Sequence, residues 1–162
     1  MFAKKKAPMP QAGARAPEFR LKRLDGGDVA LEDLLQDGPA LLAFFKISCP
    51  VCQMTLPFLD RIHSGGRLRV YGISQNDAED THAFVREYGV HFPMLLDEEN
   101  DRFPASNAYG ISHVPTSFLV EPDGMVGRVI EGWIRSEILW LGARGGVDPI
   151  GSSDQVPEWK AG

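Results

Sequence analysis

Cysteine is scarce in this 162-residue chain, which contains only Cys49 and Cys52. A small secreted domain held together by disulfides needs more cysteines, spread along the chain, so that class is excluded. Long apolar runs are also missing: the longest, Ala40–Phe45, is far too short for a transmembrane segment. Positive charge is in deficit, with 17 Lys and Arg against 22 Asp and Glu, so the sequence predicts no nucleic-acid partner.

The rest of the composition is that of an ordinary globular protein, with 43% apolar and 24% charged residues. The length predicts one domain at residues 16–144, a flexible N-terminal tail at 1–15 and a C-terminal tail at 145–162. Residues 4–6 are lysines, but the apolar stretch of about 7–15 residues that a signal peptide requires does not follow them. We therefore expect a cytoplasmic location for the chain as written, or an extracytoplasmic one if a signal has been removed.

Strand and helix patterns alternate through the middle of the chain and end with a hairpin and a helix. This order predicts an α/β fold with a mixed central sheet and helices on both faces. The expected strands are Glu18–Leu24, a return strand from Val29, Ala40–Phe45, Arg67–Ser74, Pro93–Leu96, Pro115–Val120 and Met125–Ile130. The expected helices begin at Val51, at an Asn76/Glu79 capping box, at Asp101 and at Arg135, and Pro57 should kink the first of them.

The two cysteines lie where the apolar strand ends and an amphipathic helix begins, as Cys49-Pro50-Val51-Cys52. Free backbone N–H groups and the positive end of the helix dipole favour a thiolate at that point. Cys52 is one helical turn further on and should be the more buried sulfur. We therefore expect Cys49 to be the nucleophile and Cys52 to be the resolving cysteine of a redox-active pair.

Three other interpretations of the pair remain open. A purely structural disulfide would close too short a loop to remove much unfolded-state entropy. A zinc site would need more ligands from His63, His82, His91 and His113, none of which has partner spacing. An inert buried pair would not favour a strand-to-helix junction with a proline between the sulfurs. We predict no metal.

From about Ala16 to Ala143 the chain resembles the thioredoxin superfamily, specifically the TlpA- and ResA-like thiol–disulfide oxidoreductases. The resemblance implies a three-layer thioredoxin-like fold with an N-terminal β-hairpin extension. A CxxC alone is common, but together with a Val-Pro-Thr-Ser-Phe segment about sixty residues later it is quite specific. The matching segments are Ala16–Leu21, Leu24–Gly26, Leu31–Leu34, Cys49–Cys52, Pro57, Tyr109–Ile111, Val114–Val120 and Asp123–Gly124.

The resemblance also implies how a partner binds. Pro115 should follow a cis peptide bond and pack against the sulfurs, as cis bonds are essentially confined to X-Pro. The backbone of Val114 should pair with an extended segment of the partner. Pro50 and Val51, between the sulfurs, are expected to contact the same partner.

The chain departs from this family around the cysteines. Ser48 replaces the usual Trp, and neither Ala43 nor Thr55 supplies the carboxylate that usually accepts a proton from the buried thiol. Lys46 and His113 are candidates for tuning the cysteine pKa values instead.

These observations predict an enzyme that reduces disulfides in protein partners through Cys49 and Cys52. Its cofactor would be the Cys49–Cys52 disulfide itself, and an external thiol reductant would supply electrons, since no glycine-rich nucleotide fingerprint is present. One alternative is a peroxiredoxin-like thiol peroxidase, although Lys46 stands where that family places Thr. Another is a Sco-like copper-binding assembly factor using His113, although that family separates its cysteines by three residues rather than two.

Overall fold

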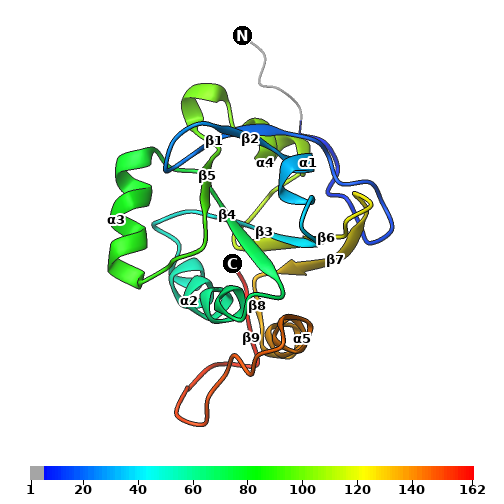
Figure 1. Cartoon of the computed structure of the whole chain (residues 1–162). Coiled ribbons are helices and arrows are strands. Elements are labelled where there is room, and N and C mark those ends of the chain that lie inside the picture. The colour runs from blue at the N-terminus through cyan, green and yellow to red at the C-terminus, as the bar shows by residue number, and fades with distance from the viewer. Residues whose placement is uncertain (1–5) are drawn as a thin grey trace.

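The computed structural model describes residues 6–162, and within it a seven-stranded mixed sheet runs through the molecule in the order β2-β1-β5-β4-β3-β6-β7 (Figure 1). A second sheet pairs β8 with β9. The strands are β1 (Arg20–Arg23), β2 (Asp28–Ala30), β3 (Ala40–Phe45), β4 (Arg69–Ser74), β5 (Met94–Leu96), β6 (Thr116–Val120), β7 (Val126–Glu131), β8 (Trp133–Ile134) and β9 (Trp159–Lys160).

Helices cover both faces of the large sheet, as predicted. The helices α2 and α5 pack together on one face, and α1 and α4 lie over the other (Figure 1). The helices are α1 (Leu31–Leu34), α2 (Pro50–Ser64), α3 (Ala78–Tyr88), a 3₁₀ turn η1 (Glu99–Asp101), α4 (Pro104–Ala108) and α5 (Arg135–Gly145).

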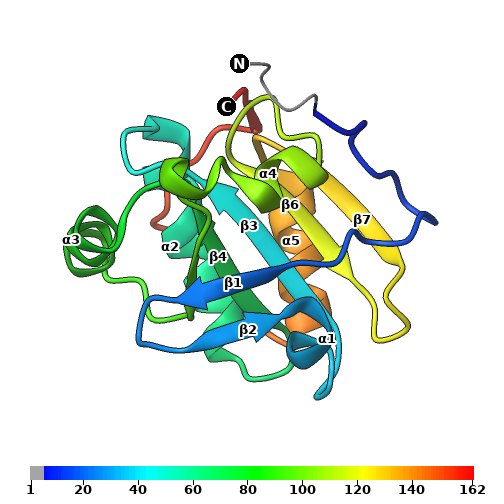
Figure 2. The same cartoon turned by 90° about the horizontal axis from the view of Figure 1, so that it is seen from above.

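The strand β3 is an interior strand of the sheet, and its six residues are all buried. It pairs in parallel with β4 and antiparallel with β6. Because the sheet is covered on both faces, the sequence of β3 is apolar throughout rather than alternating. The hairpin β1–β2 extends the sheet beyond β5, to which β1 is antiparallel (Figure 2). The N-terminal hairpin extension and the thioredoxin-like layering are thereby confirmed.

Two predicted helix starts are wrong. The helix expected from Asp101 begins at Pro104, because Arg102 and Phe103 adopt left-handed backbone conformations, with φ of 63° and 49°. The side chain of Asp77, not Asn76, caps α3 by accepting a hydrogen bond from Asp80 N at 2.8 Å. The Asn76 side chain instead accepts from Ile47 N at 3.0 Å, in the loop after β3. This long-range contact competes with the local cap and ties the start of α3 to the loop that precedes Cys49.

Both segments taken as tails have defined places among the described residues. In the N-terminal one, Ala7 N donates to Asn107 O, and Arg15 forms a β-bridge with Met125. Residues 1–5 of that predicted tail lie outside the described residues. In the C-terminal one, β9 pairs antiparallel with β8.

Candidate active site

The carboxyl end of β3 delivers the chain to Cys49, the N-cap residue of α2. Pro50 follows at the first helical position, where its missing N–H costs nothing. The Cys49 sulfur accepts a hydrogen bond from Cys52 N at 3.1 Å. A backbone donor at a helix N-terminus stabilises a thiolate at that atom.

Cys52 is fully buried one turn inside α2, while Cys49 is half-buried, and both are free thiols. Burial raises the pKa of the Cys52 thiol, and its hydrogen bond with Cys49 raises it further. A backbone hydrogen bond to Lys46 and the positive charge of that residue act in the opposite direction without overcoming burial. Cys52 is therefore held as a thiol.

The loop before β6 completes the site from the other side. The Val114–Pro115 peptide bond is cis, and both residues are buried. The Cys49 thiol donates to the carbonyl oxygen of Val114 at 3.5 Å. The structure thus brings together Cys49, Cys52 and Val114, although Val114 follows Cys49 by 65 positions in the sequence.

The loop between β3 and α2 is held by side chains from outside it. Gln53 Nε2 donates to Ile47 O at 2.9 Å, and Asn76 Oδ1 accepts from Ile47 N on the same residue. Cys49 N donates to Lys46 O at 3.3 Å. These bonds fix the backbone leading into the nucleophile, which the local sequence pattern did not reveal.

His113 lies on the same loop as Val114, but its ring pairs with other groups. Its Nε2 lies 3.3 Å from Glu131 Oε1, and its Nδ1 shares a hydrogen bond with Ser112 Oγ at 3.1 Å. No group of three or more His, Cys, Asp or Glu side chains within residues 6–162 is arranged to hold a metal ion.

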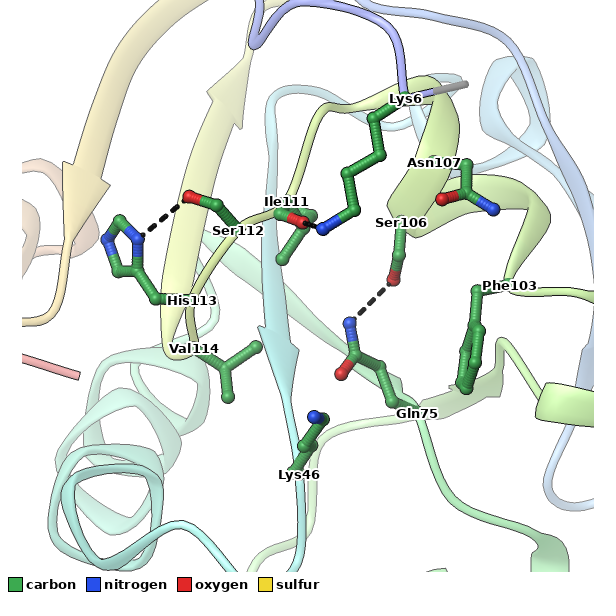
Figure 3. Close-up of a pocket in the computed structure, with 10 residues that line it drawn as sticks. All are labelled: Lys6, Lys46, Gln75, Phe103, Ser106, Asn107, Ile111, Ser112, His113 and Val114. Carbon is green, nitrogen blue, oxygen red and sulfur yellow. Dashed lines mark hydrogen bonds between the residues drawn. The ribbon is translucent and has the colours of Figure 1, made fainter. Parts of the chain in front are cut away.

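A pocket of about 260 Å³ is lined in part by Val114, whose carbonyl oxygen accepts from the Cys49 thiol (Figure 3). Its lining also includes Lys46, Gln75, Phe103 and Lys6. Lys6 Nζ donates to Ile111 O at 2.6 Å, which holds the N-terminal segment over this opening. Sequence reasoning missed Lys6, Gln75 and Phe103, since they come from three distant parts of the chain.

The fold and the site define a class: a thioredoxin-like α/β domain whose CxxC dithiol begins a helix beside a cis-proline loop. Residues 12–129 match the AhpC/TSA family, so the chain belongs to that family.

Curated relatives place the chain within it. It is 31% identical over 126 residues to the thiol-disulfide oxidoreductase ResA of Bacillus thuringiensis (strain Al Hakam), covering 75% of this chain and 70% of that protein. Identity to ResA of Bacillus subtilis (strain 168) is 30% over 131 residues, covering 78% and 71%. The predicted ResA-like resemblance is confirmed, and the chain is a thiol–disulfide oxidoreductase.

A solved structure bears on the fold alone. It is assigned to the thiol:disulfide interchange protein DsbE of Chlorobium tepidum and superposes with a TM-score of 0.71 at 22% identity. The match covers 83% of this chain and 95% of that one.

Proposed function

We propose that Cys49 attacks a disulfide of a protein partner and that Cys52 resolves the resulting mixed disulfide. The Cys49 thiolate bonds to one partner sulfur, and the other leaves as a thiolate that takes up a proton. Cys52 then loses its proton to solvent and attacks the Cys49 sulfur. The Cys49–Cys52 disulfide forms and the second partner thiol is released, so the partner gains two electrons and two protons.

The difference in burial between the sulfurs carries this assignment. A partner disulfide can reach Cys49, which is half-buried, but not Cys52, which is fully buried and has a raised pKa. Cys52 N also donates to the Cys49 sulfur, so the resolving residue already lies against the atom that it attacks.

The partner would bind beside Val114 through backbone pairing, with Pro115 packing at the sulfurs. Val114 O lies against the Cys49 thiol, so an extended segment paired there has its disulfide close to the nucleophile. Pro50, which is exposed, would contact the same segment from α2, and the notably less accessible Val51, which is buried, would contact it only at its edge. This arrangement supports protein substrates rather than a particular small molecule.

Lys46 is the better supported of the two tuning residues. Its positive charge lowers the pKa of Cys52 against the effect of burial, which favours deprotonation in the resolving step. His113 would act through its imidazole ring, although Glu131 and Ser112 hold that ring.

The catalytic cycle would close when an external thiol reductant reduces the Cys49–Cys52 disulfide, the only cofactor that we propose. The compartment stays a prediction: a reducing cytosol would keep the pair as a dithiol that acts as a reductant. No helix within residues 6–162 is long and apolar enough to span a membrane.

The two alternative functions find less support. Lys46 still stands where a peroxidase would need Thr, and the curated relatives are oxidoreductases of the ResA type. The copper alternative needs His113 beside the sulfurs, but Glu131 and Ser112 engage its ring. Peroxide consumption with an added thiol, and metal analysis of freshly reduced protein, separate these alternatives from disulfide reduction.

Insulin reduction tests the roles of the two cysteines. Cys49→Ser should abolish activity, whereas Cys52→Ser should accumulate a mixed disulfide that mass spectrometry maps to Cys49. The matched serine replacements keep size and hydrogen bonding at each position. If Cys52 traps the partner in the Cys49→Ser variant, the roles are reversed and the proposal is wrong.

A further inference from the structure

The segment Trp159–Gly162 lies against the loop to which the proposed function assigns partner binding. A Cβ added to Gly162 would overlap the carbonyl oxygen of Val114 and would lie 3.0 Å from Pro115 N. Glycine alone permits so close a backbone approach. The Cys49 thiol donates to the same Val114 oxygen, so the segment reaches the group that neighbours the nucleophile.

Gly132 closes the contact from the end of β7. Its N–H donates to Pro115 O at 2.8 Å, and it adopts a φ of 75°. A Cβ on Gly132 would lie 2.6 Å from Lys160 O and 3.2 Å from Gly162 N. Three backbone segments therefore meet at one place, and Figure 2 shows the C-terminal end of the chain at the end of the sheet where β3 terminates.

Backbone pairing directs the segment to this place. Trp159 and Lys160 form β9 and pair with Ile134 and Trp133 of β8. Arg135 N donates to Glu158 O at 2.9 Å, just before β9. Along an antiparallel ladder, hydrogen-bonded pairs alternate with pairs that are not hydrogen-bonded. Arg135–Glu158 is a hydrogen-bonded pair and Ile134–Trp159 is the next pair along, so Trp133–Lys160 is again hydrogen-bonded.

Few of the contacts that attach this segment to the domain are buried. Residues 157–162 are all exposed, and the Trp159 side chain is 63% exposed. The buried Trp133 indole donates to Pro157 O at 2.6 Å, and Asp154 pairs with Arg61 at 2.7 Å at the surface. Segments held in this way open at a small fraction of the global unfolding free energy.

We infer that residues 159–162 occupy the place of the partner's extended segment beside Val114 and compete with it within the same chain. The inference rests on the proposed function, in which the partner pairs with that backbone. A partner would bind only the fraction of molecules in which the segment has left, so its apparent affinity is the intrinsic affinity multiplied by that fraction. A small disulfide that needs no backbone pairing would react without this penalty.

Lys160→Pro tests the competition in the full chain, because it removes the N–H that β9 contributes and leaves the domain core untouched. Lys160→Ala is its control, since it removes the same side chain and keeps the N–H. Asp154→Asn loosens the segment at a second point. Glu121→Gln is the control for it, because it weakens a comparable pair with Arg144, at 2.6 Å, on α5.

The readouts are kcat/KM for insulin and for the small uncharged bis(2-hydroxyethyl) disulfide. Lys160→Pro should raise kcat/KM for insulin about two- to tenfold, and Asp154→Asn about twofold, with the small disulfide and both controls unchanged. An unchanged insulin rate in Lys160→Pro, or an equal rise with both disulfides, would overturn the inference while the proposed function stands. A wild-type protein that reduces neither disulfide would overturn the proposed function and the inference with it.

Discussion

Removal of the Asp97 carboxylate should destabilise the side of the domain that forms the pocket beside the active site. Asp97 follows β5, is fully buried, and accepts three hydrogen bonds from the start of α4. Ala105 N and Ser106 N each donate at 2.8 Å, and Ser106 Oγ donates at 2.5 Å. One carboxylate thus orients the first turn of α4, whose Ser106 also accepts from Gln75 Nε2 at 2.8 Å.

The magnitude follows from the donors that Asp97→Ala would leave buried without partners. Each costs about 1 kcal/mol or more, so unfolding free energy should fall by about 3 kcal/mol. For a domain of this size, that corresponds to a drop in Tm of about 6–12 °C. Asp97→Asn keeps the volume and one oxygen acceptor, so it should lose about half as much.

Burial also raises the pKa of Asp97, against the three donors that lower it, and this gives the prediction a pH dependence. The unfolded carboxyl ionises first, so the part of the stability that is linked to protonation of Asp97 is full below about pH 3.9 and is lost as pH rises through the raised folded pKa. The hydrogen bonds that the carboxylate accepts remain at pH 7. Urea denaturation of wild type, Asp97→Ala and Asp97→Asn, repeated between pH 3 and 8 at intervals of about one pH unit, measures the loss of unfolding free energy and its pH dependence. Equal urea midpoints for wild type and Asp97→Ala at pH 7 would refute the reasoning.

Two further predictions concern the packing of β4. His63 Nδ1 accepts from Val70 N at 2.9 Å, and burial lowers the pKa of His63, so stability should fall as pH drops from about 6.5 towards that lowered value. His63→Gln should abolish this slope in urea titrations, and a slope that persists would contradict the assignment. Gly72→Ala should cost about 1–3 kcal/mol by urea denaturation, because the new Cβ would overlap Met94 Sδ and lie 3.0 Å from the Phe92 ring. Unchanged stability there would show that the rings move aside freely.

Local patterns were sufficient for the elements that build the site. The run Ala40–Phe45 predicted a central strand because burial on both faces demands apolar residues without alternation. The amphipathic pattern after Cys49 predicted a helix from Val51, and α2 begins one residue earlier, at Pro50. Both signals are contained in the few residues that form the element.

Long-range contacts explain what the sequence could not reveal. Asn76 had the spacing of a helix cap, but a donor from Ile47 engages its side chain. Lys6 and Gly162 came from segments taken as tails, yet Lys6 lines a pocket together with Val114, and Gly162 lies against the Val114 carbonyl group. A local sequence pattern does not indicate which distant part of the backbone a short polar segment will contact.

The absence of an acidic side chain near the buried Cys52 thiol concerns the second of the two proposed chemical steps, the attack by Cys52. Both positions that relatives use for a carboxylate are buried here, as Ala43 and as Thr55, whose hydroxyl donates to Val51 O at 2.7 Å. The groups that act on the Cys52 pKa are then Cys49 and Lys46, and their net effect with burial is to raise it. In the proposed resolving step Cys52 has to lose its proton before it attacks, because attack requires the thiolate. The burial that raises the pKa of Cys52 therefore acts on the proposed release of the partner, and not on the first attack by Cys49.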